Sequence, residues 1–222
     1  MDFKEVSSRM RVAMFDMDGT LVDSMQDWRK CNIDHLESVG CHPTAEQRPY
    51  IIQASSGIML FDYVRKTFGI EIDKPTFQAL QRQRMYDAYA RGVAVKPGVV
   101  DYLRYLRARG VMTVVTTATW ATHTALALSR SGLLPYFDGI YTCDIVGASK
   151  RDPAYFEKVA EFCGHPKEEC VLFEDALYAI EGGRKAGILG AVALADPTNT
   201  LFRDDMRRVA DVFVESMADL PR

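Results

Sequence analysis

Two aspartates, Asp16 and Asp18, stand one residue apart at the end of an apolar run, Val12–Phe15, and directly before Gly19. Carboxylates are seldom fully buried unless they are paired, protonated or bound to a cation. Their position at the exit of a buried strand is therefore costly for folding alone. The pattern favours a bound cation and a reaction at this end of the strand.

Polar side chains also follow the next three apolar runs. Thr116 and Thr117 end the second run, Lys150 follows the third after a loop, and Glu174-Asp175 ends the fourth. In an open parallel sheet, ligands bind beyond the carboxyl ends of the strands, where the strand order reverses. The sequence therefore predicts that these acids, hydroxyls and one lysine converge on a single edge.

These groups suit the transfer of a phosphoryl group to a carboxylate. Asp16 and Asp175 can offer Mg²⁺ hard oxygen ligands, and Lys150 adds a second positive charge to oppose the charge of the phosphate. The Thr116 hydroxyl and the backbone N–H groups after it could bind phosphate oxygens. Asp18 shares the strand face of Asp16 and would carry the proton, which requires a pKa well above the usual value of about 3.9.

The elements that must position these residues alternate between short apolar runs and helical patterns. This alternation predicts an α/β fold with a doubly wound, mostly parallel sheet covered by helices on both faces. Strands are expected at Val12–Phe15, Met112–Val115, Gly139–Thr142, Val171–Phe173 and Ala191–Leu194, with a weaker one at Val212–Val214. Helices are expected at Val99–Arg109, His123–Ser131, Tyr155–Phe162 and Leu177–Ala186.

Residues 22–93 interrupt the alternation and show only helical patterns. These patterns cover Met25–Val39, a stretch around Ile51–Phe68, and Pro75–Ala90, while Lys96–Gly98 marks the return to the sheet. We therefore expect two domains: an α/β core made of residues 1–21 and 94–222, and a helical cap domain made of residues 22–93.

Together the motifs resemble the haloacid dehalogenase superfamily, which consists mostly of phosphatases and mutases. The matching residues are Asp16-Met17-Asp18-Gly19-Thr20, Thr116, Lys150 and Glu174-Asp175. The stretch from Leu172 to Ile188 is particularly similar to the branch that contains beta-phosphoglucomutase. The resemblance covers nearly the whole chain and implies a Rossmann-like core with a helical cap inserted after the first motif.

The resemblance also implies a role for each position. Asp16 would attack phosphorus and become an aspartyl-phosphate, and Asp18 would protonate the leaving group and then activate water. Asp16, the backbone carbonyl of Asp18 and Asp175 would hold Mg²⁺, with Glu174 a nearby or direct ligand. The residues that would hold the phosphoryl group are Thr116 and Lys150, with Thr117 as a further candidate. The expected reaction is hydrolysis of a small phosphomonoester, such as a sugar phosphate.

The chain departs from the family pattern at two places. Arg151 follows Lys150 where the family usually has proline. In the mutases, an arginine in the cap loop corresponding to residues 55–58 grips the distal phosphate, and this chain has no arginine there. This difference weakens the alternative of a sugar-phosphate mutase.

Possible substrate contacts in and near the cap are Ser55, Ser56, Arg84 and His123. A third hypothesis, from another class of protein, is that the chain has weak catalytic activity and binds phosphorylated metabolites in a binding or regulatory role.

Composition limits the partners. The chain has 222 residues, 48% of them hydrophobic, and a net charge of −3, which disfavours a nucleic-acid surface built on positive charge. No run approaches the roughly 20 apolar residues of a membrane span, and the start lacks the pattern of a secretory signal. The five cysteines are scattered, as is typical of reduced thiols. We expect a cytoplasmic monomer that acts on a small phosphorylated metabolite.

Overall fold

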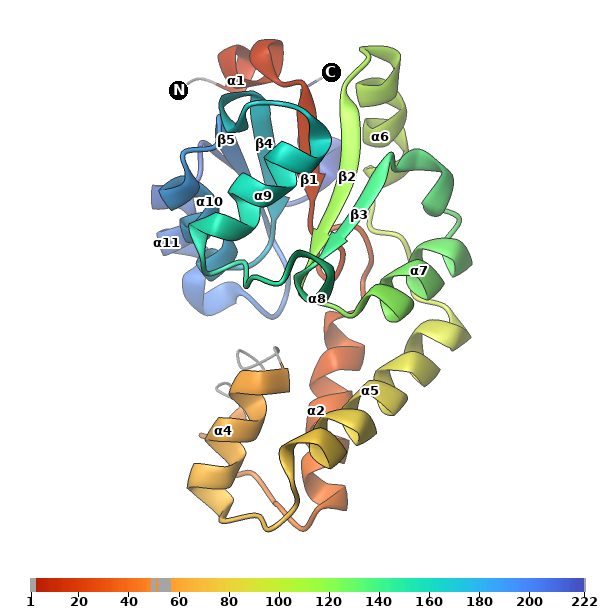
Figure 1. Ribbon diagram of the computed structural model, residues 1–222, viewed down its shortest axis with the longest axis vertical. Coiled ribbons are helices and arrows are strands. Elements are labelled where there is room, and N and C mark those ends of the chain that lie inside the picture. Colours follow the sequence, from red (N-terminus) through yellow and green to blue (C-terminus); the bar gives the residue numbers. More distant parts are fainter. Residues whose placement is uncertain (1–2, 49–50, 52–56, 222) are drawn as a thin grey trace.

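The computed structural model describes residues 3–48, 51 and 57–221, and in these residues one six-stranded parallel sheet forms the centre (Figure 1). The strand order is β3-β2-β1-β4-β5-β6. The strands are β1 (Val12–Phe15), β2 (Met112–Thr117), β3 (Gly139–Thr142), β4 (Cys170–Glu174), β5 (Gly190–Leu194) and β6 (Val212–Val214). The chain proceeds from β1 to one side and returns to β4 on the other, so the strand order reverses between β1 and β4. The predicted α/β fold and its six strands are confirmed.

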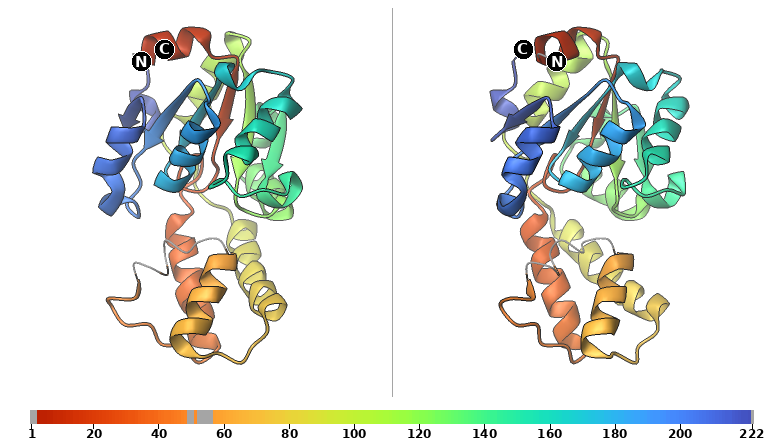
Figure 2. Two further views of the ribbon diagram at one scale, coloured as in Figure 1. Left: turned by 60° about the vertical axis from the view of Figure 1, so that its left-hand side comes forward. Right: turned by 90° about the vertical axis from the view of Figure 1, so that its left-hand side faces the viewer.

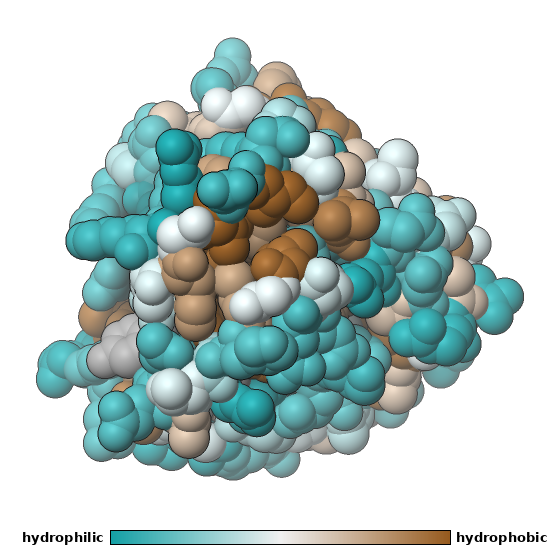
Figure 3. All heavy atoms as spheres, turned by 90° about the horizontal axis from the view of Figure 1, so that it is seen from below, coloured by the Kyte–Doolittle hydropathy of each residue, from teal (hydrophilic) through white to brown (hydrophobic). Residues whose placement is uncertain are grey.

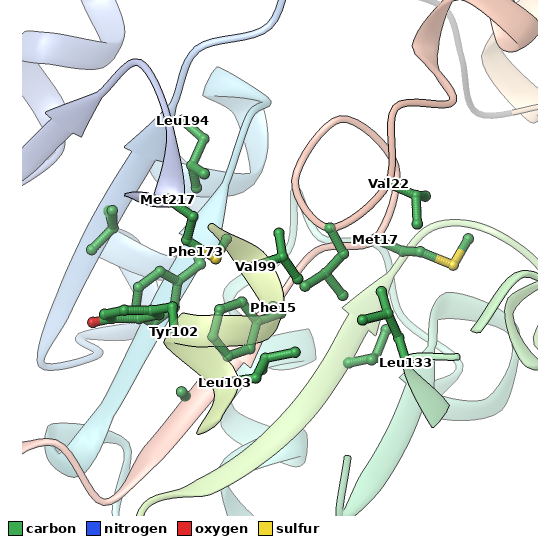
Figure 4. Packing of buried hydrophobic residues seen from close by; sticks show 14 of the residues in the cluster. Phe15, Met17, Val22, Val99, Tyr102, Leu103, Leu133, Phe173, Leu194 and Met217 are labelled. Atoms are coloured by element: carbon green, nitrogen blue, oxygen red, sulfur yellow. The ribbon is translucent and has the colours of Figure 1, made fainter. Parts of the chain in front are cut away.

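Helices cover both faces of the sheet because neighbouring strand residues point to opposite sides. Phe15 of β1 belongs to a hydrophobic cluster with Tyr102 and Phe173, shown in Figure 4, and the Phe15 and Phe173 rings stack with centroids 4.4 Å apart. Met14 instead belongs to a second cluster, with Phe156 on the opposite face. The first face is covered by α6 (Val99–Ala108) and α7 (Ala121–Arg130). The second is covered by α9 (Pro153–Cys163), α10 (Leu177–Ala186) and α11 (Arg203–Val209).

Several short elements have no counterpart in the predictions from sequence. They are the helices α1 (Phe3–Arg9), α8 (Cys143–Val146) and α11, and the 3-10 turns Leu134–Tyr136, Lys167–Glu169, Thr200–Phe202 and Met217–Asp219. Helices of seven residues or fewer complete too few turns to show a clear apolar period. Val6 of α1 and Met206 of α11 are nevertheless fully buried, so tertiary packing stabilises these helices.

In the described part of residues 22–93, three helices form an insertion beyond the carboxyl ends of the strands (Figures 1 and 2). They are α2 (Met25–Ser38), α4 (Gly57–Phe68) and α5 (Lys74–Arg91). Leu36, Val64 and Phe77 belong to a hydrophobic cluster that is separate from the two clusters of the sheet. The ends of α2 and α5 nearest the sheet join the sheet's first cluster, through Trp28 and Tyr89. The insertion therefore has an apolar centre of its own and packs onto the strand ends.

The surface is mainly hydrophilic at the end of the molecule that carries the insertion. Figure 3, which looks at this end from below, shows apolar side chains gathered near the middle of the face and polar ones around them. None of the helices in the described ranges combines the length and the hydropathy needed to cross a membrane.

Candidate active site

A cavity of about 630 Å³ lies where the strand ends meet the insertion. Its wall includes residues that follow four strands and residues of the two insertion helices α2 and α5. From the strand side come Asp16, Asp18, Thr117, Thr119, Lys150, Arg151, Glu174, Asp175 and Tyr178; from the insertion come Met25, Trp28 and Gln78. The structure thus brings together most of the residues that the sequence predicts to converge.

Three buried carboxylates lie close together on the wall of this cavity, and two of them pair with the Lys150 ammonium group. Oxygen atoms of Asp16, Glu174 and Asp175 all lie within 4.8 Å of one another. The Lys150 Nζ donates to Asp16 Oδ1 at 2.7 Å and to the Thr116 carbonyl at 2.9 Å, and it also pairs with Glu174. Because only 1% of Lys150 is exposed, its charge is held by these partners and not by water.

When its three carboxylates are ionised, this cluster carries more negative charge than Lys150 can balance, and burial makes that excess costly. Burial is the largest cause that raises the pKa of Asp16, and the neighbouring Glu174 raises it further, while Lys150 lowers it. Burial also raises the pKa of Asp175, with Asp16 and Glu174 adding to the effect. Burial opposes the charge of Lys150, but Asp16 and Glu174 raise its pKa well above the usual value. Three close carboxylate oxygens facing a cavity are a suitable donor set for a hard divalent cation.

Gly19 allows the turn after β1 to lie close to Asp175, a candidate metal ligand. Gly19 has a φ of +83°, and a Cβ at this position would lie 2.2 Å from Asp175 Oδ2. The next residue, Thr20, donates its hydroxyl to Asp175 Oδ1 at 3.5 Å. A side chain at position 19 would therefore collide with a candidate ligand, and the left-handed backbone would also disfavour it.

Gly182 likewise allows a close approach, here between helix α10 and the backbone of Lys150. A Cβ on Gly182 would lie 2.0 Å from the Lys150 carbonyl oxygen, whereas a Cβ on the adjacent Gly183 would meet the flexible end of Ile188 at 2.8 Å. Helix α10 can therefore pack directly against the backbone that carries the lysine only because residue 182 lacks a side chain.

We predict that Gly182→Ala lowers the free energy of unfolding by about 1–3 kcal/mol, despite the better helix propensity of alanine, because the Lys150 backbone must move. Turnover should fall as well, since Lys150 contacts Asp16. Gly183→Ala is the matched control, with a smaller effect because Ile188 can change rotamer. Thermal unfolding and turnover of both variants check this prediction, and equal effects of the two variants would contradict it.

The Asp18 carboxylate lies among three hydroxyl groups. Its Oδ1 accepts from Ser24 Oγ at 2.5 Å and from Tyr89 Oη at 2.6 Å, and its Oδ2 accepts from Thr119 Oγ1 at 2.7 Å. Tyr89 in turn accepts from the Trp28 indole N–H at 3.0 Å. The insertion thereby contributes directly to the orientation of Asp18.

Sequence reasoning missed these hydroxyl donors and one lysine. Thr119 could have been found by its spacing, because it lies two residues after Thr117 and repeats the polar pattern. Tyr89 gives no such signal, since it is far from Asp18 in the sequence. A role for Lys96 at this site was not predicted either. Its Nζ donates to the Gly19 carbonyl at 2.6 Å and pairs with Asp196 at 2.9 Å, and these two contacts anchor the turn after β1.

The two predicted threonines are placed differently, and the prediction of a phosphate-binding hydroxyl on Thr116 is corrected. Thr116 is fully buried and its hydroxyl has no hydrogen-bond partner among the described residues; only its carbonyl contacts Lys150. The strand continues to Thr117, two residues beyond its predicted end, so Thr116 shares the face of Val114 in the second cluster. Thr117 lines the cavity instead, and its hydroxyl accepts from the Thr119 backbone N–H at 3.1 Å.

The predicted substrate contacts outside the sheet are not on the described wall of the cavity. His123 is buried, with Nε2 2.9 Å from the Arg82 carbonyl and its ring against Trp120, so it joins α7 to α5. Burial raises the pKa of Cys31 and lowers the pKa of His35, both on α2; the nearby positive charge of Arg84 opposes the first shift and adds to the second. Neither His123 nor Arg84 lines the cavity. Ser55 and Ser56 lie outside the described residues.

Comparisons with known proteins agree with this arrangement. A family model described as haloacid dehalogenase-like hydrolase matches residues 10–187. The phosphoglycolate phosphatase of Caulobacter vibrioides is 26% identical over 216 residues, covering 94% of this chain and 88% of that protein. The N-acetylmuramic acid 6-phosphate phosphatase of Pseudomonas aeruginosa is 27% identical over 183 residues, covering 81% and 79%. The crystal structure of CbbY from Rhodobacter sphaeroides, in complex with phosphate, has the same fold, with a TM-score of 0.83, 20% identity and coverage of 95% and 96%.

Proposed function

The chain belongs to the haloacid dehalogenase-like hydrolases and is a phosphoric monoester hydrolase, and we propose that it hydrolyses a small phosphorylated metabolite with Mg²⁺ through an aspartyl-phosphate. The observation that carries this proposal is the buried group of Asp16, Glu174 and Asp175 where the strand order reverses, with Lys150 paired to the first two. The group offers a nucleophile, a cation site and a fixed positive charge within one cavity. Relatives named as phosphatases support the same reaction class.

Asp16 is the proposed nucleophile. The Lys150 Nζ donates to Asp16 Oδ1, and Asp16 lines the cavity. In the proposed step a carboxylate oxygen of Asp16 attacks phosphorus, forming a P–O bond to the carboxylate as the ester P–O bond breaks. The residues that would hold Mg²⁺ are Asp16, Asp175 and the backbone carbonyl of Asp18, with Glu174 nearby. The metal would reduce the repulsion between the anionic nucleophile and the phosphate. Lys150 and Thr117 would hold the transferring group, with the Lys150 charge opposing the charge that develops on it.

Asp18 is the proposed proton carrier. It would give a proton to the leaving oxygen, then remove one from the water that attacks the aspartyl-phosphate, which releases inorganic phosphate and restores Asp16. Its three hydroxyl donors position the carboxylate, and two of them, Ser24 and Tyr89, lie on the connection to the insertion and on the insertion itself.

We further propose that residues 22–93 act as a cap domain over the core formed by residues 1–21 and 94–222. The separate apolar cluster of the insertion and the place of Met25, Trp28 and Gln78 on the cavity wall support this division. A cap in this position would exclude water during phosphoryl transfer and contact the part of the substrate that leaves.

Turnover of a panel of phosphorylated metabolites with Mg²⁺ tests the proposed function. We expect release of inorganic phosphate from at least one small phosphomonoester, and loss of this activity when EDTA removes the metal. Conversion of glucose 1-phosphate to glucose 6-phosphate, with no free phosphate from any compound, would contradict it. Mg²⁺-dependent binding without turnover across the panel would contradict it as well.

Removing the metal should also change stability in a pH-dependent way. Burial raises the folded pKa values of Asp16 and Asp175 above 3.8, so the metal-free fold retains protons that the unfolded chain has already released. Stability of the metal-free protein should therefore fall as pH rises from the unfolded values through the raised folded values. Because Mg²⁺ binds the ionised carboxylates, the increase in Tm on adding Mg²⁺ should be larger at about pH 8 than at about pH 5. Thermal unfolding in Mg²⁺ and in EDTA measures this, and an equal increase at both pH values would contradict it.

A further inference from the structure

We propose that Arg151 binds a second anionic group of the substrate, so that this phosphatase prefers phosphomonoesters carrying a carboxylate or a second phosphate. This inference rests on the proposed function and names a substrate class for the same site. Arg151 stands directly after Lys150 and lines the same cavity.

Arg151 is the free cation on the described part of the cavity wall. Five carboxylates and two cations line that part, and the carboxylates are Asp16, Asp18, Asp144, Glu174 and Asp175. Lys150 is paired with Asp16 and Glu174, whereas Arg151 forms no ion pair with any described residue. An anion beyond the phosphoryl group would be repelled by most of this wall, so Arg151 is the place where it can bind.

The guanidinium of Arg151 is oriented without using its hydrogen-bond donors. Its central carbon lies 4.1 Å from the centroid of the Tyr178 ring, in the first turn of α10. Burial raises the pKa of Tyr178, so the ring stays neutral and presents its face to the cation. A stacked guanidinium keeps its N–H groups free at the edge of its plane, where they can form two parallel bonds to a carboxylate or phosphate.

The turn that carries Arg151 is itself well anchored. The Arg151 backbone N–H donates to Ser149 Oγ at 3.3 Å, and the Asp152 backbone N–H donates to the Ser149 carbonyl at 2.9 Å. Asp152 then caps α9 by accepting from the Ala154 backbone N–H at 2.9 Å. The backbone that carries Lys150 and Arg151 is therefore held by contacts within the core, without contacts to the insertion.

The insertion offers no equivalent cation on the described cavity wall. Met25, Trp28 and Gln78, its contributions to that wall, are uncharged. Residues 49–58 of the sequence contain no lysine or arginine. Arg82 instead lies over the ring of Trp120, 5.6 Å from its centroid, and is not among the lining residues. The core side of the cavity is therefore the side that can meet a second anion.

The test compares substrates that differ only in the second anion. The first pair is 2-phosphoglycolate and ethyl phosphate; the second pair is propane-1,3-diol bisphosphate and propyl phosphate. We expect the wild type to have a higher kcat/KM for the doubly anionic member of at least one pair, and the pair that responds distinguishes a carboxylate from a phosphate. Arg151→Met should reduce that preference about 10- to 100-fold, mainly through KM, as expected for the loss of a charged hydrogen-bonded contact.

Matched variants separate binding from a purely structural role. Arg151→Lys should keep part of the preference, because the charge remains but the paired donors do not. Tyr178→Phe retains the aromatic face and should keep the preference, whereas Tyr178→Leu should reduce it. Arg130→Met, which removes a positive charge from the end of α7 away from the cavity, should leave the preference and the turnover unchanged.

Two outcomes would overturn the inference while leaving the proposed function in place. One is a wild type that hydrolyses both members of each pair equally well; the other is an Arg151→Met variant whose preference equals that of the wild type. If Arg151→Met does not fold, as judged by thermal unfolding, the Arg151→Lys and Tyr178→Leu variants decide. A wild type that hydrolyses no phosphomonoester with Mg²⁺ would overturn the proposed function and, with it, this inference.

Discussion

Replacing Asp16 with asparagine should reduce turnover by about 10³-fold or more, because the amide cannot attack phosphorus and the covalent route is lost. The substitution is nearly isosteric, so the fold should be retained. Asparagine also removes one of the three carboxylates that crowd the cation site, and Mg²⁺ should therefore bind more weakly to the variant.

Steady-state turnover of the best substrate measures the main effect. Mass spectrometry after acid quenching should detect phosphate on the wild-type peptide that contains Asp16 and none on the variant. Asp204→Asn is a suitable control, because the Asp204 side chain is 99% exposed and lies on α11. Near-normal turnover by Asp16→Asn would refute the proposed nucleophile.

Replacing Lys150 with methionine should affect activity and stability together. Lys150 is the ammonium group that neutralises Asp16 and Glu174 in a site that is almost completely buried. Removing one partner of a buried ion pair typically costs about 3–5 kcal/mol, since the other partner remains buried and uncompensated. Turnover should fall by about 10²- to 10³-fold, because a fixed charge that opposes the developing phosphoryl charge is lost.

Chemical unfolding and turnover, each with and without Mg²⁺, check this second prediction. Added Mg²⁺ should recover part of the lost stability, because it compensates the same carboxylates, but it should not restore normal turnover. Lys185→Met is the matched control, since Lys185 is exposed near the end of α10. A Lys150→Met variant as stable and as active as this control would show that the ion pair has neither role.

The two variants together separate the functions of the neighbouring groups. Asp16→Asn should mainly remove chemistry, whereas Lys150→Met should remove both chemistry and a structural contact. The difference follows from geometry: Asp16 lines the cavity, while Lys150 donates to Asp16 and to the Thr116 carbonyl of the neighbouring strand. Measuring the free energy of unfolding beside turnover is therefore necessary for interpreting either result.

Much of the fold could be predicted because its signals are local. A strand buried on both faces is a short apolar run, and the polar residue that follows it marks the strand end. Val12–Phe15 followed by Asp16 is one such case, and Val171–Phe173 followed by Glu174-Asp175 is another; the observed strands are Val12–Phe15 and Cys170–Glu174. The parallel topology then brings these ends to one edge, so Asp16, Lys150 and Asp175 could be grouped before any coordinates were known.

The strand ends and the long-range contacts required the tertiary structure. The sequence predicts that β2 ends at Val115, but the strand continues through Thr116 and Thr117, which pair with β3, and no local pattern reveals this pairing. His123 is a predicted substrate contact because it lies near the second motif, yet its ring packs against Tyr86 and Tyr89 of the insertion.

The sequence by itself predicted which acids, which lysine and which strand ends lie together, because apolar runs that end in polar residues are local patterns and their alternation with helices favours parallel strands that end at one edge. Only the tertiary structure decided what surrounds that chemistry. Tyr89 reaches Asp18 across 71 positions, and Arg151 finds Tyr178 on another helix. Such contacts depend on how whole elements pack, and packing between distant segments leaves no periodic pattern in a single chain. Asp16 and Asp18 could therefore be recognised from their neighbours in the sequence, while the hydroxyl groups that donate to Asp18 could be found only in the folded molecule.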